Sequence, residues 1–96
     1  MGDPTIFRMY PGGDVIALFP AIPADLQGNC LSYQHVGQHG AADPGHVTSH
    51  TRPATPDEYR DPMAELTGIG YMVRPVRRVT RRMAENRRAT LARWRE

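Results

Sequence analysis

Residues 5–19 of the chain, TIFRMYPGGDVIALF, decide its fold class. Two runs rich in β-branched and aromatic residues, 5–10 and 14–19, flank Pro11, Gly12 and Gly13. Glycine adopts the positive φ angles of a tight turn without steric cost, so the pattern predicts a β-hairpin. An isolated hairpin is only marginally stable in water, so the remaining residues must extend the sheet or cover it.

The next part of the chain predicts one more strand and then a loop. Residues 29–36, NCLSYQHV, are typical of a third antiparallel strand, and Gly37 and Gly40 weaken its end. Residues 41–53 are rich in Gly, Pro, Ser, Thr and His, which predicts a long loop with room for a short strand at 46–51. Loops of this length usually carry function or move.

The clearest local signal is a helix start at residues 55–58, TPDE. Thr55 can cap the helix, Pro56 suits the first helical position, and Glu58 completes a capping box. Apolar side chains then recur at helical spacing, at Tyr59, Met63, Leu66 and Ile69. Glycines at 68 and 70 end the helix, and core packing explains its apolar stripe.

Residues 70–79 predict a fourth strand, and Pro75 favours a sheet edge because proline cannot donate a ladder hydrogen bond. Thr80 can cap a last helix that runs to about Arg93, within a basic C-terminal segment at 80–96. We therefore expect one small α+β domain spanning residues 1–96. Its antiparallel sheet has three to four strands, with one packed helix and a basic C-terminal helix.

Charge is divided unevenly along the chain, and all 12 basic residues are arginine. Residues 74–96 hold nine arginines and two glutamates, a net charge of +7, whereas residues 1–73 hold three arginines and eight acids, a net charge of −5. Arginine makes planar, bidentate contacts with phosphate and carboxylate groups. The asymmetry predicts a surface for an anionic partner. Its candidate residues are Arg74, Arg77, Arg78, Arg81, Arg82, Arg87, Arg88 and Trp94.

That surface has an alternative interpretation. The last helix is then simply solvated, and Trp94 anchors it to the core or to a second copy of the chain. A thin core makes a homodimer plausible.

Histidines gather in the middle of the chain, at His35, His39, His46 and His50, and Cys30 precedes them. Imidazole and thiolate are zinc ligands, but four residues of a strand span about 13 Å, too far for one ion to bridge. We therefore expect no metal and no cofactor. A polar recognition surface is the second interpretation of this region, formed by Tyr33, Gln34, His35, Gln38 and His39. In the alternative interpretation, Tyr33 is a core residue and the other four side chains face solvent without a binding role.

The sequence offers no catalytic residue that we can assign. Cys30 is the only cysteine, lies in no nucleophile signature and excludes an internal disulfide. Neither a P-loop nor a dinucleotide fingerprint is present. No apolar run approaches the length of a membrane span, and the N-terminus lacks the order of a signal peptide. We expect a cytoplasmic binding protein that is not an enzyme and has no membrane partner.

Three stretches, VIALFP at 15–20, YQHVGQHGAAD at 33–43 and PATPDEY at 53–59, resemble a group of short proteins from phage, plasmid and integrated-element regions of proteobacteria. The resemblance covers roughly residues 5–80 and implies only a context, that of a mobile-element accessory factor. Together with the charge, it favours contact with nucleic acid or a nucleoprotein complex through the arginine-rich segment. The alternatives are an inhibitor that binds a host defence protein, with an acidic surface as its target, and a small-ligand or metal site around Cys30, His35 and His39.

Overall fold

The predicted hairpin is present in the computed structural model, which describes residues 2–34 and 38–95. Strands β1 (Asp3–Met9) and β2 (Val15–Pro23) pair antiparallel, with Phe7 opposite Ala17. The turn closes where the Tyr10 carbonyl accepts a hydrogen bond from the Gly13 N–H at 2.9 Å. Gly13 has a φ of 99°, the region that glycine tolerates and other residues avoid.

The sheet is larger than the three to four strands expected from the sequence. Among the described residues it has six strands. Five lie in the order β4-β3-β2-β1-β5, and the sixth, β6, also pairs with β1. The strands that follow the hairpin are β3 (Cys30–Gln34), β4 (Gln38–Ala42), β5 (Arg52–Pro53) and β6 (Val73–Pro75). Of these, β4 and β5 were not expected from the sequence. The first four strands run antiparallel in sequence order, while β5 and β6 share the outer edge of β1.

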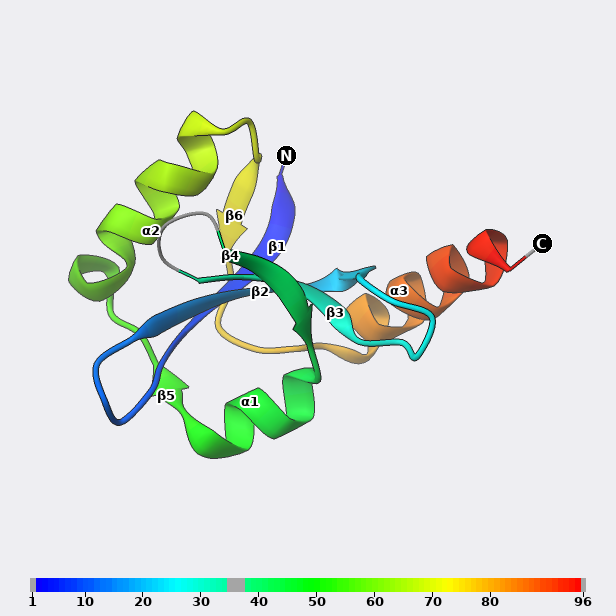
Figure 1. The fold of residues 1–96 in the computed structure, drawn as a ribbon, viewed down its shortest axis with the longest axis horizontal. Coiled ribbons are helices and arrows are strands. Elements are labelled where there is room, and N and C mark those ends of the chain that lie inside the picture. Colours follow the sequence, from blue (N-terminus) through cyan, green and yellow to red (C-terminus); the bar gives the residue numbers. More distant parts are fainter. Residues whose placement is uncertain (1, 35–37, 96) are drawn as a thin grey trace.

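In the part of the chain that the structure describes, three helices complete the α+β fold, namely α1 (Pro44–His50), α2 (Pro56–Gly68) and α3 (Arg81–Trp94). Helices α2 and α3 have the N-caps that the sequence predicted, Thr55 and Thr80. Figure 1 shows α2 and α1 on opposite sides of the sheet, with α3 extending away toward the C-terminus. The molecule is elongated as a result, with principal extents of 40, 29 and 22 Å.

Each face of the sheet has its own core. Helix α2 covers one face, where Leu66 packs among side chains from alternate strand positions, Phe7, Ala17, Phe19 and Tyr33. The other face is covered by Val47 of α1 and by Val76 and Val79, which precede α3. Its buried strand residues are Ile6, Ile16, Leu18 and Cys30. This division follows from the two-residue alternation of side chains in strands.

Two expectations for residues 38–53 are wrong. The glycine-containing segment 38–42 forms strand β4 because it pairs along the whole of β3, from Gln34 opposite Gln38 to Cys30 opposite Ala42. Residues 44–50 form a helix and no short strand, because Asp43 caps it and Pro44 starts it. Its C-terminal end is held by Arg8, which donates hydrogen bonds to the Thr48 and Thr51 carbonyls at 3.0 and 2.6 Å.

The strand predicted at residues 70–79 is shorter than expected and covers only Val73–Pro75. It lies at an edge of the sheet, as Pro75 indicated.

Candidate functional site

Helix α3 is formed by strong local signals. The Thr80 hydroxyl accepts a hydrogen bond from the Met83 N–H at 3.2 Å, and the Met83 sulfur accepts one from the Thr80 N–H at 3.5 Å. Its inward side buries Met83 and Leu91. Both ends of the helix are therefore fixed, one by the cap and the other by Leu91, whose side chain lies close to Gly28.

Arg87 points inward from α3 and is set apart from the other arginines of the helix. Its guanidinium donates a hydrogen bond to the Pro20 carbonyl at 2.6 Å. Its Nε is buried and has no hydrogen-bond partner within residues 2–34 and 38–95. Arg87 therefore ties α3 to the end of β2, and only part of its charge reaches solvent.

The exposed side of α3 and its C-cap carries five arginines, which we call the basic surface: Arg81, Arg82, Arg88, Arg93 and Arg95. The first, third and fifth recur every seven residues and so line one side of the helix, while the other two lie on a second side. Arg93 contacts Thr90, and Arg95 donates a hydrogen bond to the Leu26 carbonyl. In the part of the chain that the structure describes, none of the five pairs with a carboxylate.

The structure does not bring all the predicted arginines to that surface. Arg74 lies on β6 and donates a hydrogen bond to the Gly2 carbonyl at 3.3 Å. Arg77 lines a groove beside Tyr59 and the residues that lead into α2. Arg78 is exposed in the connection that precedes α3. Sequence spacing alone could not separate these positions, because the path of residues 73–80 depends on the pairing of β6 with β1.

Trp94 ends α3 and is 50% exposed. Leu26 is 58% exposed, and the hydrogen bond from Arg95 places the Leu26 backbone at the same end of the molecule. A large apolar side chain that is half in solvent and flanked by arginines is available to a partner.

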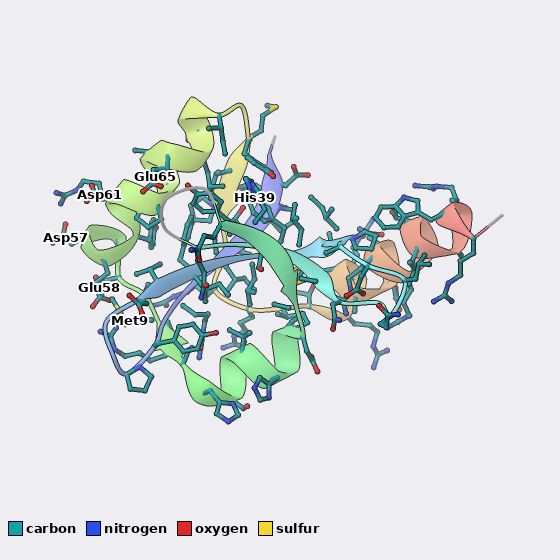
Figure 2. All side chains as sticks on the ribbon, in the orientation of Figure 1. Met9, His39, Asp57, Glu58, Asp61 and Glu65 are labelled. Atoms are coloured by element: carbon teal, nitrogen blue, oxygen red, sulfur yellow. The ribbon has the colours of Figure 1, made fainter. Side chains whose placement is uncertain are left out.

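Acidic side chains occupy the opposite end of the molecule. Asp57, Asp61 and Glu65 lie along α2 (Figure 2). Asp57 pairs with Arg60 at 2.6 Å, and Glu58 pairs with Arg52 at 2.6 Å. The Arg52 guanidinium and the Thr55 N–H lower the pKa of Glu58 to about 2.

The predicted polar recognition surface is divided between the two faces of the sheet. On the α2 face, the Tyr33 hydroxyl donates a hydrogen bond to Glu65 at 2.6 Å, and the ring of His39 lies 5.0 Å from that of Tyr33. The cross-strand pair Gln34 and Gln38 lies on the other face, in a groove of about 420 Å³ between β4 and α1. His35 is outside the described residues.

Cys30 and His39 also lie on opposite faces, since Cys30 packs with Ile16 and Leu18 whereas His39 contacts Tyr33 and Tyr71. Burial raises the pKa of the Cys30 thiol to about 11, which makes it a poor nucleophile and a poor metal ligand. Among the described residues, no group of three or more His, Cys, Asp or Glu side chains is arranged to hold a metal ion.

Comparisons with known proteins do not assign the chain. No protein-family model matches it, and neither a curated protein nor a solved structure shows a significant match. None of the helices in the described ranges has both the length and the apolar character needed to cross a bilayer.

Proposed function

We propose that this chain is a non-enzymatic binding protein that contacts nucleic acid, alone or within a nucleoprotein complex, through the basic surface of α3. The observation that carries the proposal is the position of Arg81 and Arg82. They occupy the first turn of α3, where no acidic residue is present. Positive charge at a helix N-terminus opposes the helix dipole and costs about 0.3–1 kcal/mol for each charge. Residues that break a local rule without a structural benefit are typical of functional sites.

The geometry of the basic surface suits a charged backbone. Arg81 and Arg95 are four turns of helix apart, roughly 21 Å along the axis. Duplex DNA presents one negative charge for every 1.7 Å or so, and each neutralised phosphate releases bound counterions. Several phosphates can therefore contact the five arginines at once, and the planar guanidinium group favours bidentate contacts. Phosphate contacts position a protein without reading bases, so we propose weak sequence preference.

The experiment is a salt titration of binding to labelled duplex DNA, single-stranded DNA and RNA. Replacing Arg81 and Arg88 with Gln removes two charges from the basic surface. The log–log slope of affinity against salt should become shallower by about 0.9 for each lost contact on duplex DNA. The matched control replaces Arg52 and Arg60 with Gln, which removes the same net charge from the α2 end. Absence of binding to all three probes at low ionic strength would rule the proposal out.

The exposed Trp94 supports one alternative, an inhibitor that binds an acidic surface of a host protein. Partly exposed tryptophan flanked by arginine is the composition of interface hot spots. Trp94→Ala should then abolish binding to that protein in nuclease-treated samples, whereas under the favoured proposal it weakens binding to single strands through lost base stacking.

A further inference from the structure

Helix α1 places His46 and His50 side by side, whereas the strand expected at residues 46–51 would have separated them. His46 and His50 are four residues apart and both are exposed on the helix. Their ring centroids lie 4.3 Å apart, with the planes tilted by 35°. The objection to a shared metal ion was the length of four residues in a strand, and it does not apply to a helix, where residues i and i+4 are neighbours.

The hydrogen bonds of His50 fix which ring nitrogen is free. Its Nδ1 lies 2.8 Å from the His46 carbonyl oxygen and 2.9 Å from the Ser49 hydroxyl. That hydroxyl also donates to the His46 carbonyl, at 2.8 Å. A carbonyl oxygen can only accept a hydrogen bond, so Nδ1 carries the ring hydrogen. In the neutral ring Nε2 then holds the lone pair, which neither of these two hydrogen bonds uses. Histidines that bind metals commonly donate their second nitrogen to a backbone carbonyl in this way.

We propose that His46 and His50 chelate one late first-row divalent cation, Ni²⁺, Cu²⁺ or Zn²⁺, with water at the remaining coordination positions. Imidazole suits these cations, whereas Mg²⁺ and Ca²⁺ require oxygen ligands. The site is on the surface and does not hold the fold together, because Asp43 caps α1 and buried Val47 anchors it without a metal. The proposal is independent of nucleic-acid binding.

The test is isothermal titration of the metal-free full chain with Cu²⁺, Ni²⁺, Zn²⁺ and Mg²⁺. We expect one cation per chain, affinity highest for Cu²⁺ and no binding of Mg²⁺. His46→Gln and His50→Gln should each weaken Cu²⁺ binding at least about tenfold, because a second ligand on the same helix acts at high effective concentration. The matched control is His39→Gln, which removes an exposed histidine on β4.

A second measurement locates the cation. Paramagnetic Cu²⁺ should broaden the amide NMR signals of α1 selectively, and this broadening should vanish in the His46→Gln variant. Circular dichroism should show that the variants remain folded, since both histidines are exposed. The proposal fails if Cu²⁺ binding is unchanged in both α1 variants, or if His39→Gln is the substitution that removes it.

Discussion

Helices α2 and α3 begin alike and then differ in what their charges do. Each has a threonine N-cap whose hydroxyl accepts a hydrogen bond from the third helical N–H. Helix α2 places Asp57 and Glu58 in its first turn, where negative charge favours the helix dipole, and both pair with arginine. Helix α3 places Arg81 and Arg82 there. The first-turn charges of α2 favour the dipole of their own helix, whereas Arg81 and Arg82 oppose the dipole of α3, which favours a role for these two arginines outside the fold.

The two helices also differ in how deeply they are packed. Leu66 of α2 is fully buried in a cluster with four strand residues, and Tyr59 stacks on Phe7 with ring centroids 4.3 Å apart. Helix α3 buries Met83 and Leu91 but ends in an exposed Trp94.

Shortening the buried leucines of α2 and α3 should destabilise the chain most. Leu66→Ala and Leu91→Ala should both destabilise the chain, within the range of about 2–5 kcal/mol for buried leucines. Leu66→Ala should lie near the upper end and Leu91→Ala near the lower end, because Leu91 sits closer to solvent. Urea denaturation measures both. Equal costs would show that α3 belongs to the main core.

Two neighbouring arginines on α3, Arg87 and Arg88, have different expected roles. Arg87→Gln should lower the free energy of unfolding by about 1–3 kcal/mol, since it removes a charged hydrogen bond to the Pro20 carbonyl. Arg88→Gln should leave stability nearly unchanged and weaken binding to nucleic acid. Thermal unfolding and a salt titration on both variants separate the two roles. If Arg87→Gln changes the salt dependence of nucleic-acid binding as much as Arg88→Gln does, the two arginines do not have separate roles.

The two caps should contribute differently. Thr55→Ala and Thr80→Ala each remove an N-cap, at a cost of about 1 kcal/mol. Thr55→Ala should cost more. Alanine keeps the backbone N–H, but loss of the hydroxyl loosens the turn that holds this N–H against the Glu58 carboxylate at 2.8 Å, a stronger hydrogen bond than that of the Thr80 N–H to a methionine sulfur. Chemical denaturation of the two variants measures the loss in free energy of unfolding for each, and a larger loss for Thr80→Ala would contradict this order.

The smallest effect is a dependence on acid. Arg52 and the Thr55 N–H lower the pKa of Glu58 to about 2 in the folded chain. The hydrogen bonds to Glu58 therefore stabilise the fold fully above about pH 4.3, the pKa of glutamate in the unfolded chain. This stabilisation is lost as the pH falls toward 2. Glu58→Gln should flatten the acid limb of the stability curve, modestly because the pair is exposed to solvent. Asp61→Asn, an exposed acid of α2, is the control.

Local signals account for the elements that the sequence predicted. Thr55, Pro56 and Glu58 define the start of α2, and Thr80 that of α3, because caps act within a single turn. Strand β4 was missed because its residues, QHGAA, have little strand propensity and are held by pairing with β3. Helix α1 was missed although Asp43 and Pro44 carry a cap signal, because the surrounding residues are typical of a loop.

The candidate site was predicted in part. The charge of residues 74–96 indicated an arginine-rich segment, and six of its arginines lie on α3 and its C-cap, five of them in the basic surface. The inward direction of Arg87 could not be predicted, since it depends on where the end of β2 lies. The division of Tyr33 and His39 from Gln34 and Gln38 follows from strand alternation, but only once β4 is known to pair with β3.

The outer edge of β1 has a consequence for how the chain reaches its fold during synthesis. Asp3 pairs with Val73, a partner 70 residues further along, and Met9 pairs with Arg52. A ribosome releases the β1–β2 hairpin well before the partners of its open edge, β5 and then β6. Contacts between such distant residues slow folding, and an unpaired strand edge is a template for association with other chains. The nascent protein is therefore most exposed to misassembly between the release of β2 and the arrival of β6.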